Sequence, residues 1–209
     1  MSQHDSTTLH NPVLLNEVID HFPETNHQKL IGLDGTFGRG GHSHALLRQF
    51  DKLTMIAMDQ DQQAIEYAKE TYPDYISSGR LHLYNNNFEE IGAVVAEAKD
   101  KLQFDKLDFI LLDLGVSSPQ LDVAERGFSF YNEGPLDMRM NLQQDLTARD
   151  VLHNYSEDEL IEVFQKLGEV RSPYRVVRAI VHDRKEKEFN STLDLAQMIE
   201  RIERWKKKG

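Results

Sequence analysis

The strongest constraint on this chain is a glycine-rich segment that follows a short apolar run. Residues 31–42 read IGLDGTFGRGGH, which predicts a strand, an acidic residue at its end and a tight turn that opens a helix. Gly35, Gly38, Gly40 and Gly41 fall within seven residues. Because glycine allows positive φ and a close approach to the backbone, this turn is typical of a loop that holds a ligand against main chain. A glycine turn without a ligand is the alternative.

The spacing of these glycines argues against two common nucleotide loops. A phosphate-binding G-x-x-x-x-G-K-[ST] loop beginning at Gly35 has Gly41 and His42 where lysine and Ser/Thr are required. A dinucleotide G-x-G-x-x-G loop beginning at Gly38 has Ser43 in place of its last glycine. The first motif is therefore excluded, and a nicotinamide-dependent oxidoreductase becomes a disfavoured alternative.

The first half of the chain alternates between strand and helix patterns. Four segments predict parallel strands, at residues 30–33, 53–58, 80–84 and 107–112, and the first two are the apolar runs expected of buried strands. Helical periodicity separates them, so the fold class is α/β and Rossmann-like, with the carboxyl ends of all four strands at one edge of the sheet. From residue 116 the chain is first loop-rich and then helical. We therefore predict a core over residues 1–115 and a helical subdomain over residues 116–209.

Three further side chains fall at the predicted strand ends. Asp59, 19 residues after Gly40, is placed to accept the hydroxyls of a ribose, or to cap the following helix, a task that Asp61 also suits. Phe88 is placed to pack on a nucleobase, or in the core. Asp113 follows the fourth strand, as a ligand contact or as a turn residue. Together they predict a nucleoside-type ligand.

Composition excludes several chemistries. The 209 residues contain no cysteine, which rules out a cysteine nucleophile, a thiolate zinc site and methylation of cytosine C5 through a cysteine adduct. We predict no metal site. The start of the sequence lacks a signal peptide and no apolar run reaches membrane-spanning length. We therefore expect a cytoplasmic protein without a membrane partner, and its self-association stays open.

Five strings of consecutive residues resemble the RsmH (MraW) family of 16S ribosomal RNA cytosine-N4 methyltransferases. They are HNPVLLNE at 10–17, DGTFGRGGHS at 34–43, LDLGVSSPQLD at 112–122, ERGFSF at 125–130 and GPLDMRM at 134–140. The resemblance runs from about residue 8 to the end of the chain. It implies transfer from S-adenosylmethionine (SAM) to the exocyclic amine of a cytidine in 16S ribosomal RNA or the small subunit. It also implies a methyltransferase core with a helical insertion.

The resemblance also implies roles for particular residues. The implied SAM contacts are Asp34, Gly38, Gly40, Gly41, His42, Asp59 on the ribose, Phe88 near the adenine, Asp113 and Gln120. His42 has an alternative as a polar residue in the first turn of a helix. Asp113 is also the expected catalytic acceptor for the target amine. Many amine methyltransferases have Asp/Asn-Pro-Pro-aromatic here, whereas this chain has Asp113-Leu-Gly-Val116, so the aromatic that stacks on the base must come from elsewhere.

Aromatic and basic residues of the second half are candidates for contacting RNA. Phe128, Phe130 and Tyr131 are candidates for stacking on the base, unless they close the loop as a hydrophobic pin. Arg126 and Arg139 flank them, to orient the target nucleotide or to form salt bridges with Glu125 or Asp137.

A charge asymmetry extends these candidates to the end of the chain. Residues 1–165 have a net charge of −16, and residues 166–209 a net charge of +5. Arg171, Arg175 and Arg178 share one face of a predicted helix at i, i+4 and i+7. Arg184, Lys185, Lys187 and residues 206–208 extend this basic patch for RNA phosphates. A solvated helical surface is the alternative.

A complete methyltransferase sheet has more strands than the four predicted, and members of the family continue beyond the insertion. We therefore expect this chain to be the N-terminal portion of such an enzyme. The alternative is a truncated, inactive module that binds SAM or RNA.

Overall fold

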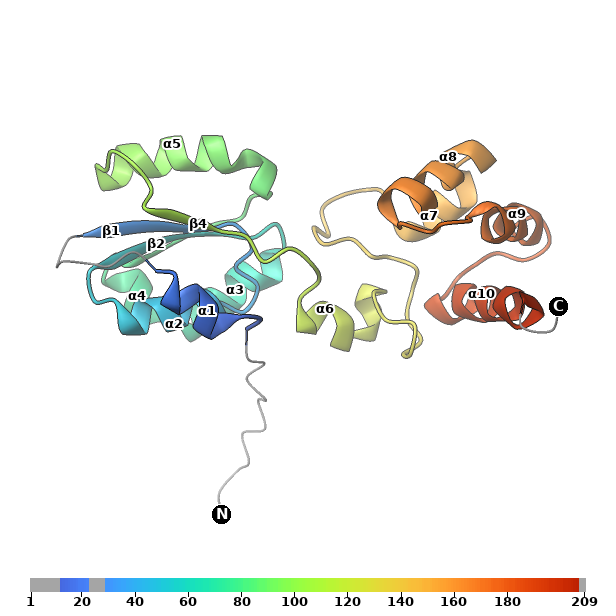
Figure 1. The fold of residues 1–209 in the computed structure, drawn as a ribbon, viewed down its shortest axis with the longest axis horizontal. Helices are drawn as coiled ribbons and strands as arrows, with labels where there is room; N and C mark the ends of the chain where they lie inside the picture. Colours follow the sequence, from blue (N-terminus) through green and yellow to red (C-terminus); the bar gives the residue numbers. More distant parts are fainter. Residues whose placement is uncertain (1–11, 23–28, 207–209) are drawn as a thin grey trace, which may run out of the picture. The chain divides into compact units, whose positions relative to one another are not determined.

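The computed structural model describes residues 12–22 and 29–206 and, within the last helix, the side chains as far as Ile202 (Figure 1). The chain divides into two compact units between Ser117 and Ser118. Each unit is built around its own hydrophobic core. We describe the units one at a time.

The first unit contains a four-stranded parallel sheet, as the sequence predicts. Its strands are β1 (Leu30–Asp34), β2 (Leu53–Met58), β3 (Leu81–Tyr84) and β4 (Phe109–Leu111). The order across the sheet is β3-β2-β1-β4, and every pair is parallel. All residues of β1 and β2 are buried, which explains why both strands are continuous apolar runs. The prediction of an α/β, Rossmann-like fold is confirmed.

Helices cover both faces of this sheet, with α5 (Ile91–Leu102) on one face and four helices on the other (Figure 1). The four are α1 (Leu15–Asp20), α2 (Gly41–Gln49), α3 (Gln62–Thr71) and α4 (Pro73–Ser77). Side chains alternate along β1, so Leu30 packs in the core beneath α2, and Ile31 and Leu33 pack in the core beneath α5. Burying each such side chain contributes about 1.5–3 kcal/mol.

The fourth predicted strand has different bounds in the structure. The predicted fourth strand covered residues 107–112, but β4 is only Phe109–Leu111. Side chains join the pairing just beyond both ends of this strand, although the Asp108 amide still donates to the Ile31 carbonyl at 2.8 Å. The Ile31 amide donates to the Asp108 carboxylate at 2.8 Å, and the Asp113 amide donates to the Thr36 hydroxyl at 2.7 Å. Elsewhere in this unit, α3 (Gln62–Thr71) ends before Pro73, which begins α4 (Pro73–Ser77).

The second unit is helical around one core, as the periodicity predicts. Its elements are α6 (Ser118–Asp122), η2 (Ala124–Arg126), α7 (Ala148–Asn154), α8 (Glu157–Glu162), a π-helical turn η3 (Val163–Leu167), α9 (Tyr174–Asp183) and α10 (Thr192–Lys206). Leu152, Leu160, Val177 and Ile180 are among the buried residues of the core. A capping box formed by Ser156 and Glu159 begins α8.

The loop that carries the aromatic residues is anchored to the start of α10. Pro135 pairs with Ser191, the Gly134 amide donates to the Thr192 hydroxyl at 3.3 Å, and that hydroxyl donates to the Asn132 carbonyl at 3.0 Å. A search for membrane-spanning helices among the described residues finds none long and apolar enough.

Candidate functional site

The glycine loop follows β1 and is tied to the end of β2. The Gly38 amide donates to Asp59 Oδ2 at 2.7 Å, and the Asp61 amide donates to Asp59 Oδ1 at 2.8 Å. One carboxylate therefore joins the loop to the turn after β2. Asp61, and not Asp59, caps α3, because its carboxylate accepts the Gln63 amide at 3.0 Å. The alternative that Asp59 caps this helix is wrong.

The four glycines of this loop meet different surroundings. A Cβ at Gly35 would lie 2.6 Å from Leu112, one at Gly40 would lie 2.4 Å from Phe37, and one at Gly41 would lie 2.5 Å from Pro12. Packing within the protein therefore restricts Gly40 and Gly41 most strongly, because the Leu112 side chain beside Gly35 is flexible and exposed. Gly38 differs, because it has φ of 55° and a Cβ there would meet nothing within 4 Å. Its backbone faces open space at the ligand edge of the sheet.

Asp34 lies beneath this loop and is only 2% exposed. Its carboxylate accepts the Ser43 hydroxyl at 2.7 Å and the Thr36 amide at 3.1 Å, which joins β1 to the first turn of α2. Burial raises the pKa of Asp34 to about 6, although both hydrogen bonds act to lower it. The structure thus places Asp34 as a support of the loop, and its direct contact with a cofactor stays a prediction.

His42 and Asp113 face each other across the ends of β1 and β4. His42 Nδ1 lies 4.0 Å from Asp113 Oδ2, and His42 Nε2 lies 2.9 Å from the Val13 carbonyl oxygen. The His42 side chain is buried, whereas about half of the Asp113 side chain is exposed. The exposed carboxylate of Asp113 is therefore available to a molecule bound at this edge.

Phe88 begins η1 (Phe88–Glu90), directly after β3. It is 40% exposed and belongs to none of the hydrophobic cores, so the alternative of a core phenylalanine is wrong. The neighbouring Asn85 side chain donates to the Asp59 carbonyl at 2.8 Å. An exposed aromatic ring at the ligand edge suits stacking on a base.

Several contributors to this site were not predicted from the sequence. The Thr36 hydroxyl accepts the Asp113 amide, and the Ser43 hydroxyl donates to the Asp34 carboxylate. Pro12 packs against Gly41 of the glycine loop, and the Val13 carbonyl oxygen contacts His42, which follows that loop. Hydroxyl residues inside the glycine motif are the signal that identifies the first two. Among the described residues, no group of three or more His, Cys, Asp or Glu side chains is arranged to hold a metal ion.

The predicted site residues of the second unit are mostly held by their own loops. Gln120 is buried in α6. Arg126 is also buried and donates to the Arg139 and Met140 carbonyls at 3.0 and 3.1 Å. Arg139 forms two hydrogen bonds with the Asp137 carboxylate, at 2.7 and 2.9 Å, which is the salt bridge weighed as the alternative. RNA contact by either arginine stays a prediction.

The predicted arginine face needs one correction. Arg175 and Arg178 lie on α9 and are exposed, but Arg171 precedes the helix, because Pro173 occupies its N-cap. Arg178 Nε lies 3.5 Å from Glu157 of α8. Arg184 turns inward to the Leu152 and Tyr155 carbonyls, and Lys187 pairs with Asp194 at 2.8 Å. The predicted basic run 206–208 lies outside the described side chains.

A parallel α/β sheet with a glycine loop after β1, an acidic residue after β2 and an acidic residue after β4 defines a Rossmann-like methyltransferase fold. A family profile described as the MraW methylase family matches residues 7–209. The chain therefore belongs to the MraW methylase family.

Curated relatives share one name, ribosomal RNA small subunit methyltransferase H. The relative from Bdellovibrio bacteriovorus is 49% identical over 201 residues, which is 96% of this chain and 59% of the relative. The relative from Carboxydothermus hydrogenoformans is 43% identical over 91% of this chain and 58% of its own length. The relative from a Chelativorans species is 45% identical over 92% and 52%. The chain thus spans less than two thirds of each of these relatives.

Proposed function

We propose that this chain is part of a methyltransferase that acts on the RNA of the small ribosomal subunit. The reaction we propose is transfer of a methyl group from SAM to the exocyclic N4 of a cytidine in 16S ribosomal RNA. The observation that carries the proposal is the bond between the Gly38 amide and the Asp59 carboxylate at the ligand edge. The shared name of the relatives favours methyl transfer over a module that only binds SAM or RNA.

The residues at this edge fit SAM. The side of Gly38 where a Cβ would stand is open for 4 Å. A carboxylate such as that of Asp59 has about four lone-pair sites, enough to accept ribose hydroxyls beside the Gly38 and Asp61 amides. Phe88 offers an exposed ring to the adenine. Gly40, Gly41, His42 and Gln120 complete the proposed set, with Asp34 beneath it. When bound, SAM supplies an electrophilic methyl group on a sulfonium.

We propose that the Asp113 carboxylate accepts a hydrogen bond from the cytosine amine that receives the methyl group. The lone pair of a cytosine amine is delocalised into the ring, so the amine is a weak nucleophile. A carboxylate that accepts its N–H helps the nitrogen to rehybridise and attack in line, and positioning supplies much of the remaining acceleration. The new N–C bond would replace the S–C bond, with the neutral thioether S-adenosylhomocysteine as the leaving group, and the proton lost by the nitrogen would pass to the Asp113 carboxylate. The Asp113 amide is fixed by the Thr36 hydroxyl, which holds its backbone in place.

Calorimetric titration of SAM tests the cofactor site. Asp59→Ala should weaken SAM binding about tenfold or more, because the ribose loses a charged acceptor. Asp59→Asn keeps an oxygen for the Gly38 amide and should also weaken SAM binding, which separates ribose contact from loop support. Asp51→Ala, at an exposed carboxyl in the turn before β2, is the control. Equal affinities of the wild-type chain and both Asp59 variants would contradict the proposal.

Mass spectrometry of nucleosides from small subunits or 16S RNA incubated with the chain and SAM tests the reaction. The expected product is N4-methylcytidine, and Asp113→Asn should lower its rate by about 100-fold or more, the contribution typical of one positioned acid–base group. SAM binding without any methylated cytidine would identify the binding module instead.

A further inference from the structure

Phe130 and Tyr131 of the second unit are more exposed to solvent than any other phenylalanine or tyrosine in the described part of the chain. Their exposed fractions are 61% and 83%. Neither side chain belongs to a hydrophobic core. The alternative that these two residues close their loop as a hydrophobic pin is therefore wrong, and the reaction proposed above gives them no role.

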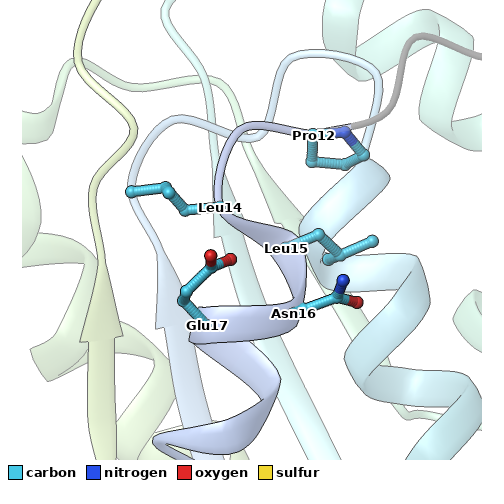
Figure 2. Close-up of a pocket in the computed structure, with 5 residues that line it drawn as sticks. All are labelled: Pro12, Leu14, Leu15, Asn16 and Glu17. Atoms are coloured by element: carbon cyan, nitrogen blue, oxygen red, sulfur yellow. The ribbon is translucent and has the colours of Figure 1, made fainter.

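The two rings form a pair, which distinguishes them from other exposed apolar side chains. Their centroids lie 4.4 Å apart, and their planes make an angle of 37°. Leu14, by contrast, is 63% exposed, and Figure 2 shows it directed away from its neighbour Leu15. Single exposed side chains of this kind are normal on protein surfaces. A ring covers only one face of its neighbour, so Tyr131 keeps an open aromatic face.

Hydrogen bonds within the loop hold this pair in place. The Met138 amide donates to the Arg126 carbonyl at 3.0 Å and closes the loop at its base. Next to the rings, the Tyr131 and Asn132 amides lie 3.2 and 3.3 Å from the Ser129 hydroxyl, to which both donate. A surface that is ordered before binding loses less conformational entropy when it binds. The pair is therefore suited to receive a ligand without rearrangement of the loop.

The residues around the rings favour contact with a base over contact with a phosphate. Residues 128–134 contain no lysine or arginine, the residues that bind phosphates, and Glu133 supplies their single charge. An exposed aromatic ring stacks on any nucleobase, because every base has a flat π face. In a duplex these faces are covered by the neighbouring bases, whereas an unpaired base leaves them free. The chemistry of the pair therefore fits an unpaired base.

We propose that Phe130 and Tyr131 form a stacking site for an unpaired base of the RNA substrate. The inference rests on the proposed function, because the shared name of the relatives, ribosomal RNA small subunit methyltransferase H, is what makes RNA the expected partner. It adds a binding site on the second unit that recognises single-stranded RNA without reading its sequence. Stacking needs no cytosine amine, so this site differs in chemistry from the acceptor site at Asp113.

The test measures binding of fluorescent oligoadenylate to the full chain by anisotropy. A strand of about 12 nucleotides lies within the range of lengths that single-strand sites occupy. Oligoadenylate contains no cytidine, so the acceptor amine contributes nothing to the signal. The wild-type chain should bind the single strand at least about fivefold more tightly than the same strand paired with oligouridylate, because stacking on one base is lost in the duplex.

Leucine at either position removes the ring and keeps an apolar side chain. Tyr131→Leu should weaken oligoadenylate binding about fivefold or more, and Phe130→Leu should also weaken it, because the remaining ring loses its partner. Tyr131→Phe keeps the ring and should bind as the wild type does. Leu167→Ala, at an aliphatic side chain of this unit that is 80% exposed, is the control for exposed apolar surface and should leave binding unchanged.

Two further measurements separate stacking from charge and from folding. Loss of the Tyr131 ring should lower the affinity by the same factor at every salt concentration, because no phosphate contact is removed. In NMR spectra, stacked adenine should move the ring-proton signals of Phe130 and Tyr131 upfield. The midpoint of thermal unfolding should not change in the leucine variants, since neither ring supports a core.

The inference is overturned if the wild-type chain binds the duplex as tightly as the single strand, if Tyr131→Leu binds oligoadenylate as the wild type does, or if Leu167→Ala loses as much affinity as Tyr131→Leu. The proposed function fails on other results, namely absent SAM binding or absent N4-methylcytidine, which oligoadenylate binding does not measure. Normal methyl transfer with unchanged oligoadenylate binding in Tyr131→Leu would overturn only the inference about the stacking site.

Discussion

At the scale of single residues, four aspartates of the first unit have four different surroundings. Asp34 is buried beneath the glycine loop, Asp59 joins two backbone segments, Asp61 caps α3, and Asp113 is half exposed. An acidic residue at a strand end is therefore not a functional assignment by itself. The hydrogen-bond partners and the burial of each carboxyl distinguish a support from a ligand contact.

The buried carboxyl of Asp34 predicts a specific dependence of stability on pH. Its pKa is raised from 3.8 to about 6 in the folded chain, so the folded state holds this proton more tightly than the unfolded state does. The resulting stabilisation is fully present below pH 3.8 and is lost as the pH rises through about 6. The pKa difference corresponds to about 3 kcal/mol. Relative to Asp34→Asn, the wild-type free energy of unfolding should fall by about this amount across that window.

Urea unfolding of both proteins at a series of pH values measures this difference, because titrations shared by the two proteins cancel. Ser43→Ala removes a hydrogen bond that lowers the pKa of Asp34, so it should move the window to higher pH. If the free energies of unfolding of the wild type and Asp34→Asn differ by the same amount at pH 3.8 and at about pH 6, the pKa of Asp34 is not raised.

At the scale of helices and strands, both units use an arginine to close the end of a helix that is distant in sequence. Arg80, which precedes β3, donates to the Leu47, Phe50 and Leu53 carbonyls at 2.6, 2.7 and 3.2 Å. Arg184 does the same for α7 through two carbonyls. The last carbonyls of a helix have no partner within the helix, so a guanidinium with several donors satisfies them together.

Arg80→Ala should destabilise the first unit by about 1–3 kcal/mol, because three carbonyls of partly buried backbone lose a charged donor. Hydrogen exchange of the α2 amides, together with urea unfolding, measures the loss. Lys at this position should restore little of it, since an ammonium group cannot reproduce the planar fork. Arg48→Ala, at an exposed arginine in the last turn of α2, is the matched control. Equal effects of the two alanine variants would mean that charge, and not capping, stabilises the helix.

Periodicity in the sequence predicts the four strands and the longer helices, but not the short helices α1, α4, α6 and α7, and long-range contacts decide where the strands end. Leu53–Met58 is recognisable because the strand is covered on both faces and every residue except Thr54 is apolar. The short β4 was not predictable, because the Asp108 and Thr36 side chains join its pairing from a distance in sequence. The same applies to the cap formed by Arg80.

The site shows the same division between local and long-range signals. The glycine motif indicates a loop, but only the structure shows that Gly40 and Gly41 are required by Phe37 and Pro12 while Gly38 faces open space. The role of residues 12–17 was equally hidden, since the sequence identifies the string without its contact to His42.

At the scale of the whole molecule, the net charge of −11 is unevenly distributed, and the exposed arginines of residues 166–209, a segment with a net charge of +5, are the candidates for a basic surface. Three other arginines of the second unit form hydrogen bonds within the unit, so they are not counted among the free charges of this surface. They are Arg126, Arg139 and Arg184. Arg175 and Arg178 of α9 are exposed. Glu157 of the acidic helix α8 lies beside Arg178 and offsets part of its charge.

The exposed arginines of α9 predict how RNA binding by this chain responds to salt. Each phosphate contact releases counterions, so the affinity falls with rising salt, with a slope of about −0.7 per contact on single strands. Arg175→Gln together with Arg178→Gln should therefore weaken binding of 16S ribosomal RNA and flatten the slope by about one to two contacts. SAM affinity should not change, because the proposed cofactor residues of the first unit are untouched.

Filter binding at a series of salt concentrations measures this slope. Arg149→Gln removes the same kind of charge from an arginine of α7 that pairs with Glu188 at 2.8 Å, and it should leave the slope near that of the wild type. If the α9 double variant and the control flatten the slope equally, the basic surface acts only through overall charge. If neither variant changes it, the charge asymmetry is that of a solvated helical surface and RNA is held elsewhere. A loss confined to α9 would make this helix the phosphate-binding surface of the second unit.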